Sequence, residues 1–160
     1  EAGQIELHAA HVSLVGLLSD AIQQLRPLAT LKGQTVTTSV QVGLNDIVAD
    51  GPKLQVVLKN LVNNAIKYSP RGGNVTVRIE DLGKEMQFSV SDQGIGMTPR
   101  QQKRLFRLYG RVIDQKKHKV SGTGVGLYAS QRLVQAHGGR IWVESKYGEG
   151  TTFFVALPKE

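Results

Sequence analysis

One predicted helix, roughly 52–68, constrains the fold most, because its two sides carry different kinds of residue. Its apolar residues recur at i, i+3, i+4 and i+7, a spacing that predicts one buried face. Asn60, Asn64 and Lys67 lie four and then three residues apart, so they form a narrow polar stripe at the border of that face. Asp50, followed closely by a proline, is typical of a helix start. The helix therefore packs on a core and leaves two amides and an ammonium group at its rim.

The other segments alternate between helices and pairs of strands. A helix is expected from Leu14 to about Lys32 with Ser13 as its N-cap, and Pro27 should kink it or end it early. This pattern predicts an α/β fold, a two-layer sandwich of one mixed β-sheet with about three helices on one face. The remaining predicted strands are 35–41, 47–49, 75–82, 86–92, 140–145 and 151–157, and the remaining predicted helices are 99–105 and 125–137.

Two glycine clusters follow the polar helix. The first, Asp92-Gln-Gly-Ile-Gly, ends a predicted strand, where a carboxylate can accept a hydrogen bond from an exocyclic amine. Its glycines let the backbone approach a flat base closely. The second, Gly122-Thr-Gly-Val-Gly, opens a predicted helix, whose free N–H groups favour anions. Each piece alone is common, but their order within one small domain indicates a site for a nucleoside triphosphate with magnesium.

Magnesium prefers oxygen ligands and usually bridges substrate phosphates, so Asn64 is the candidate ligand and Lys67 a candidate phosphate contact. The absence of cysteine excludes thiolate metal sites and disulfides. The four histidines are scattered, and the charge of His137 would suit a helix C-terminus. The net charge of +7 leaves open a phosphorylated ligand, nucleic acid or an acidic partner. The basic run 116–119 is either a solvated loop or closes on phosphates.

Taken in order, five segments resemble the N, G1, F, G2 and G3 boxes of sensor histidine kinases. They are 60–69 (NLVNNAIKYS), 92–97 (DQGIGM), the segment at Phe106, 122–127 (GTGVGL) and 148–153 (GEGTTF). The resemblance implies the Bergerat ATP-binding fold of the gyrase, chaperone and kinase superfamily. It also implies a division of the chain, with 1–11 as the tail of a preceding helical dimerisation domain or linker and 12–160 as the catalytic ATP-binding domain.

The resemblance assigns roles to individual residues. Asn64 would be the magnesium ligand, Tyr68 would pack near the adenine, and Asp92 would bind the adenine amine with help from Thr151. Residues from about 106 to 121 would form an ATP lid with Arg111 near the terminal phosphates. The full set of ATP-binding residues implied is Asn60, Asn64, Lys67, Tyr68, Asp92, Gly94, Ile95, Gly96, Met97, Arg111, Gly122, Thr123, Gly124, Val125, Gly126, Leu127 and Thr151.

Asn60 separates kinases from related hydrolases, because gyrase-like ATPases resemble each other in carrying Glu at that position. An amide cannot accept a proton, so activation of water is not expected. The resemblance therefore implies a protein-histidine kinase domain that transfers the ATP γ-phosphoryl group to a His on a separate helical domain, for relay to a response regulator. The isolated chain would be inactive without that domain.

The expected setting is the cytoplasm, in a parent protein that is either free or anchored in a membrane. This domain is expected to contact neither nucleic acid nor a membrane. Two alternatives stay open. One is an autonomous ATPase of the gyrase or chaperone type, and the other is a basic nucleic-acid-binding module.

Overall fold

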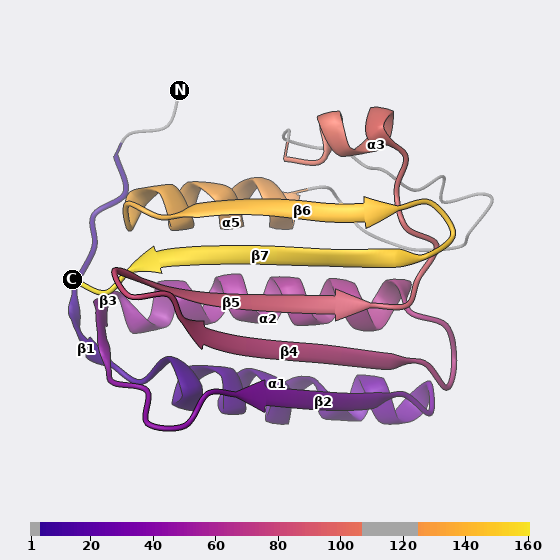
Figure 1. Cartoon of the computed structure of the whole chain (residues 1–160), viewed down its shortest axis with the longest axis horizontal. Helices are drawn as coiled ribbons and strands as arrows, with labels where there is room; N and C mark the ends of the chain where they lie inside the picture. Colours follow the sequence, from indigo (N-terminus) through magenta and orange to yellow (C-terminus); the bar gives the residue numbers. More distant parts are fainter. Residues whose placement is uncertain (1–3, 107–124) are drawn as a thin grey trace.

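The chain forms two layers, a five-stranded sheet and a set of helices behind it (Figure 1). The computed structural model describes residues 4–106 and 125–160. The sheet strands are β2 (Thr35–Val40), β4 (Asn74–Asp81), β5 (Glu85–Asp92), β6 (Arg140–Lys146) and β7 (Gly150–Pro158). Their order is β2-β4-β5-β7-β6. Only β2 and β4 run parallel, so the sheet is mixed, as predicted.

Three helices cover one face of this sheet. α2 packs between α1 and α5 and also contacts β4 and β5 (Figure 1). The described helices are α1 (Leu14–Leu31), α2 (Gly51–Tyr68), α3 (Pro99–Arg104) and α5 (Val125–Ala136). The predicted α/β sandwich is confirmed. Within the described residues, no helix combines the length and the apolar content needed to cross a bilayer.

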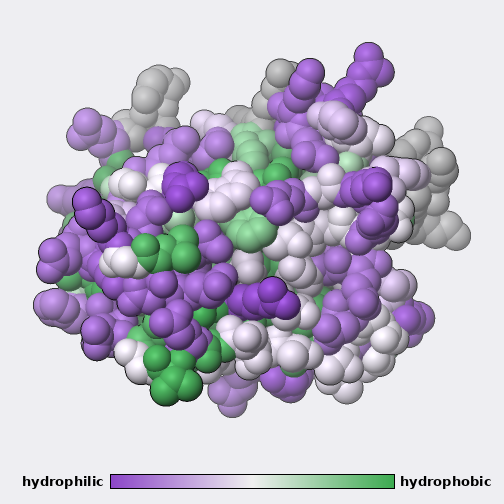
Figure 2. Space-filling model, in the orientation of Figure 1, coloured by the Kyte–Doolittle hydropathy of each residue, from purple (hydrophilic) through white to green (hydrophobic). Residues whose placement is uncertain are grey.

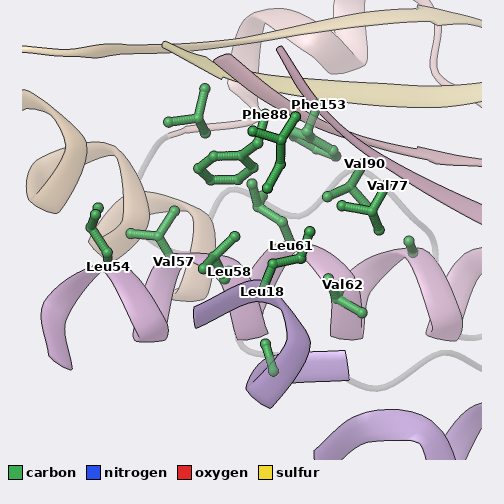
Figure 3. Packing of buried hydrophobic residues seen from close by; sticks show 14 of the residues in the cluster. Leu18, Leu54, Val57, Leu58, Leu61, Val62, Val77, Phe88, Val90 and Phe153 are labelled. Carbon is green, nitrogen blue, oxygen red and sulfur yellow. The ribbon is translucent and has the colours of Figure 1, made fainter. Parts of the chain in front are cut away.

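The core lies between α2 and the inner face of the sheet (Figure 3). Leu58 and Leu61 of α2 are completely buried and share this core with Phe88 and Val90 of β5. Alternate residues of a strand point to one face, so the intervening residues of β5 point away from the helices. That outer face of the sheet is mostly hydrophilic (Figure 2). Burying one such apolar side chain contributes roughly 2 kcal/mol, which explains why α2 is held firmly at the centre.

Pro27 does not end α1 early, so that part of the prediction is wrong. The helix continues through Pro27 to Leu31, and Lys32 caps it. Proline leaves the carbonyl of the residue four positions earlier without its helical N–H partner. Here that residue is Gln23, which is exposed like Pro27. Water can therefore satisfy the free carbonyl, and the helix tolerates the proline.

The first strand is one that the sequence does not reveal. β1 (Ala10–Val12) pairs antiparallel with β3 (Ile47–Ala49) in a separate two-stranded sheet. β1 has only three residues and no alternation strong enough to predict it. The assignment of residues 1–11 to a preceding domain stays a prediction.

The start of α2 is anchored by Asp50. Its carboxylate accepts hydrogen bonds from the backbone N–H groups of His8 (2.9 Å) and Lys53 (3.2 Å). The bond from His8, followed by those from Lys53, lowers the pKa of Asp50 to about 2. The Asp50 N–H donates to His137 Nε2 at 3.0 Å, and His137 Nδ1 faces the Leu133 carbonyl at 2.8 Å. His137 directly follows α5, so its ring links the end of that helix to the start of α2.

Candidate functional site

Three side chains form a row across β5, β7 and β6 at one end of the sheet. Asp92 lies opposite Thr151, and Thr151 lies opposite Ser145. Directly opposed residues on neighbouring strands point to the same face, and the preceding row includes Val90 and Phe153, which belong to the core. Asp92, Thr151 and Ser145 therefore form the last row of the helix-covered face, where the apolar core gives way to polar groups.

Asp92 is a half-buried carboxyl group in an unusual electrostatic setting. Burial raises its pKa to about 6, although hydrogen bonds from the backbone N–H groups of Gly94 and Thr151 act in the opposite direction. The Gly94 N–H lies 2.8 Å from Asp92 Oδ1. No cation among the described residues is paired with Asp92. A desolvated carboxylate without a charged partner is a candidate for ligand binding, and here it can accept a hydrogen bond from a donor on a ligand.

The loop after Asp92 requires its glycines for close packing. A Cβ atom added to Gly94 would lie 2.3 Å from the Tyr68 carbonyl oxygen, which is too near for any other residue. Gly96 has a φ of 71°, and a Cβ there would lie 2.1 Å from the Lys146 carbonyl oxygen. Glycine is the residue that adopts such a φ without strain. The first glycine cluster is thus pressed between the end of α2 and the β6–β7 turn.

Ser145 and Gln102 hold this loop in place, and sequence reasoning assigned a role to neither. The Ser145 hydroxyl accepts from the Met97 N–H at 2.8 Å. Gln102 Nε2 donates to the carbonyls of both Met97 and Ser145 at 3.1 Å. The sequence does carry one indication of a role for Ser145. Ile141 and Val143, which precede it on the inward face of the same strand, are apolar, so a polar residue at the next inward position is unusual.

The polar stripe of α2 lies where the sequence predicted it, on the rim of the buried face. Asn60 Nδ2 donates to the Gly126 carbonyl (3.2 Å) and to Ser130 Oγ (3.1 Å), which ties α2 to the start of α5. Asn64 is half-buried and Lys67 is exposed, and neither side chain has a hydrogen-bond or ion-pair partner among the described residues. Those two groups are available to a ligand, whereas the contact of Asn60 with ATP stays a prediction.

The C-terminal end of α2 is fastened by two side chains from the α1–β2 connection. Lys32 Nζ donates to the carbonyls of Ile66 (2.8 Å), Lys67 (3.0 Å) and Ser69 (2.7 Å). Gln34 Nε2 donates to the Ile66 and Ser69 carbonyls, each at 3.0 Å. Burial, followed by the nearby Arg71, lowers the pKa of Lys32. These bonds satisfy the carbonyls that a helix end leaves free and hold the segment that carries Lys67.

The predicted site residues thus fall into four groups, the first of which is the α2 stripe of Asn60, Asn64 and Lys67. Asp92, the 94–97 loop and Thr151 come together with the Tyr68 backbone at the end of the sheet. In α5, which begins at Val125, Gly126 accepts from Asn60, and Leu127 packs against the core. Arg111, Gly122, Thr123 and Gly124 lie outside the described residues.

Magnesium fits this chemistry only with help from other ligands. Among the described residues, no three His, Asp or Glu side chains gather as a metal site. Asn64 therefore offers one neutral oxygen, and the remaining oxygens of an octahedral site would come from phosphates and water.

Comparison with known proteins identifies the domain. A family model described as histidine kinase-, DNA gyrase B-, and HSP90-like ATPase matches residues 49–160. The chain belongs to this family. The adaptive-response sensory kinase SasA of Synechococcus elongatus is 36% identical over 155 residues, which cover 96% of this chain and 40% of that kinase. The sensor histidine kinase WalK of Bacillus subtilis is 42% identical over 111 residues, which cover 68% of this chain and 18% of that kinase.

Solved structures of histidine kinases are also similar to this chain. Full-length ShkA in complex with AMPPNP has a TM-score of 0.87 and 32% identity, with 98% of this chain and 32% of that chain covered. The catalytic domain of histidine kinase ThkA has a TM-score of 0.83 at 22% identity, with 96% and 99% of the two chains covered, and shows the same fold. This family domain is therefore the ATP-binding catalytic domain of the sensor histidine kinase type.

Proposed function

We propose that this domain binds ATP with magnesium and donates the γ-phosphoryl group to a His on a separate helical domain of the same protein. The observation that carries the proposal is the half-buried carboxyl of Asp92, which has no cationic partner among the described residues. It precedes a glycine loop packed on the end of α2, the helix that carries Asn64 and Lys67. The family and the kinase relatives support the same reaction. The chain spans 40% of the length of the SasA relative.

Each side chain has a distinct task in this proposal. Asp92, with Thr151, accepts a hydrogen bond from the exocyclic amine of adenine. Asn64 contributes an oxygen ligand to magnesium, and Lys67 places a positive charge beside phosphate oxygens. Magnesium, when bound, supplies charge neutralisation on the phosphates. The remaining residues position these groups, which matters because phosphoryl transfer depends mainly on alignment and charge stabilisation.

Position 60, one helical turn before the proposed metal ligand Asn64, carries no base that could activate water. Asn60 is an amide and donates both of its described hydrogen bonds to α5. Among the described histidines, the ring of His137 is engaged by Asp50 and Leu133. The attacking nitrogen should therefore arrive on the acceptor domain, and hydrolysis by the isolated domain should be slow.

We further propose that the phosphorylated acceptor passes its phosphoryl group to a response regulator and that the domain works in the cytoplasm. A related structure is described as histidine kinase ThkA in complex with the response regulator protein TrrA. An ATP-consuming relay of this kind needs the nucleotide pool of the cytoplasm.

The experiment compares Asn64→Ala with Asn63→Ala. Consecutive helical residues point about 100° apart, so Asn63 is a matched control on the same turn of α2. The chain is mixed with radiolabelled ATP, magnesium and the helical acceptor domain, and label on the acceptor His is measured. We expect Asn64→Ala to abolish transfer and Asn63→Ala to retain it, with both variants folded by circular dichroism. Transfer at the wild-type rate by Asn64→Ala would refute the assignment, and rapid ATP hydrolysis without an acceptor would favour an autonomous ATPase.

A further inference from the structure

A second hydroxyl group stands behind Thr151 in the row that ends the sheet. Ser145 of β6 lies opposite Thr151 of β7, and their Oγ and Oγ1 atoms are 2.9 Å apart. Thr151 is 8% exposed, so little water reaches this pair. Asp92 lies on the other side of Thr151 in the same row. Thr151 alone therefore separates Ser145 from Asp92, whose carboxyl group we propose binds the adenine base.

The hydrogen bonds of Ser145 fix which hydroxyl is the donor. Ser145 Oγ donates its proton to the Gly150 carbonyl at 2.9 Å and accepts from the Met97 N–H at 2.8 Å. A serine hydroxyl has one proton, and that proton is already used. In the contact between the two hydroxyls, Thr151 must therefore donate and Ser145 must accept.

Because Thr151 donates its proton to Ser145, its hydroxyl oxygen can only accept hydrogen bonds from a ligand that binds at Asp92. The ionised Asp92 carboxylate likewise only accepts. Two neighbouring acceptors favour a ligand edge that carries N–H donors, and they oppose an edge that carries a carbonyl oxygen, since acceptors facing each other leave buried groups unpaired.

We propose that Ser145 is a positioning residue that determines specificity. It orients the Thr151 proton so that the proposed base site selects a purine with an amine at position 6 over a purine with a carbonyl there. The inference rests on the proposed function, because it requires that a nucleotide base binds at Asp92. Ser145 itself need not touch the nucleotide. It acts through Thr151, and through Met97 in the glycine loop.

The chain supplies a matched control on the opposite face of β5 and β7, the strands that carry Asp92 and Thr151. Ser91 Oγ and Thr152 Oγ1 are 2.8 Å apart and belong to β5 and β7, one residue from Asp92 and Thr151. Because side chains alternate along a strand, this hydroxyl pair points to the outer face of the sheet. Removing its Ser tests the general effect of losing a cross-strand hydroxyl bond at this end of the sheet without touching the pocket.

The test is equilibrium binding of ATP and inosine triphosphate, measured by calorimetry on the wild type, Ser145→Ala, Ser145→Thr and Ser91→Ala. Inosine carries a carbonyl where adenine carries its amine. We expect the wild-type preference for ATP to fall on the order of tenfold in Ser145→Ala, the size of one hydrogen-bond difference. Ser145→Thr, which keeps a hydroxyl, should restore the preference, and Ser91→Ala should leave it unchanged.

Two results would overturn the inference. They are an unchanged preference in Ser145→Ala, and an equal loss of affinity for both nucleotides, which would indicate a structural role alone. If Ser145→Ala does not fold, Ser145→Cys, whose thiol is a weak donor and acceptor, takes its place with the same expectation. Asp92→Ala distinguishes a failure of the proposed base site from a failure of the role of Ser145 alone. If the wild type binds ATP and Asp92→Ala binds it equally well, the proposed base site fails. If Asp92→Ala loses ATP while Ser145→Ala keeps the wild-type preference for ATP over inosine triphosphate, the role of Ser145 alone fails.

Discussion

Replacing Asp92 by Asn should make the nucleotide-free domain more stable at neutral pH. Burial raises the pKa of this carboxyl from about 3.8 to about 6, so the folded protein disfavours its charged form. Each tenfold change in acidity corresponds to about 1.4 kcal/mol, and the ionised carboxylate therefore costs about 3 kcal/mol at pH 8. Asparagine has nearly the same shape, carries no charge, and keeps an oxygen that can accept from the N–H groups of Gly94 and Thr151.

The effect should depend on pH in a definite direction. A group whose folded-state pKa is raised favours folding most below its unfolded pKa, and this contribution is lost as pH rises through the folded value. The wild type should therefore lose stability between about pH 4 and pH 6, whereas Asp92→Asn should not. Asp50 titrates at lower pH in both proteins, so its contribution cancels in the comparison.

Urea denaturation at pH 4.5, 6 and 8, followed by circular dichroism, measures the difference. We expect the variant to exceed the wild type by about 3 kcal/mol at pH 8 and by much less at pH 4.5. Its ATP affinity should fall, because an amide oxygen is a weaker acceptor than a carboxylate. A variant that is less stable at every pH, or a gap that does not grow with pH, would refute the claim that Asp92 is held at a desolvation cost.

Two further substitutions test how α2 is anchored. Asp50→Ala should lower the free energy of unfolding by about 1–2 kcal/mol at pH 7, because it removes the N-cap acceptor of Lys53 and His8; the wild-type advantage should fade as pH drops from about 4 towards 2, which urea denaturation across that range measures. Lys32→Met should lower it by about 1–3 kcal/mol by leaving helix-end carbonyls unpaired, as measured by the same denaturation at pH 7.

Most of the fold follows from local pattern. The apolar spacing of α2, with Asp50 at its start, predicts a central helix, and the structure buries that face against β5. The alternation in 75–82 and 86–92 around a glycine turn predicts the β4–β5 hairpin that is observed. What local pattern does not contain is pairing between distant segments. β1 is the example, because its three residues become a strand only through β3, more than thirty residues later.

The candidate site likewise has features that local sequence predicts and features that depend on distant contacts. Residue types and spacing point to Asp92, Asn64 and Lys67 because a carboxylate after a strand and a polar stripe on a helix are visible in sequence. The raised pKa of Asp92 is not visible, since it depends on burial by distant elements. The roles of Ser145 and Lys32 likewise depend on contacts across the fold, which connect β6 to the 94–97 loop and the end of α1 to the end of α2.

The part of the proposed nucleotide site that would bind the base is built on the sheet. Asp92, Thr151 and Ser145 are fixed by the register of three paired strands, so the base-recognition groups are oriented before any ligand arrives. Such pre-organisation reduces the ordering cost of binding. The same rigidity keeps Asp92 desolvated in the free domain, which lowers stability until a donor meets the carboxylate. A half-buried carboxylate with no cationic partner among the described residues is hard to explain as a structural feature, but it suits a site where an incoming amine becomes its partner.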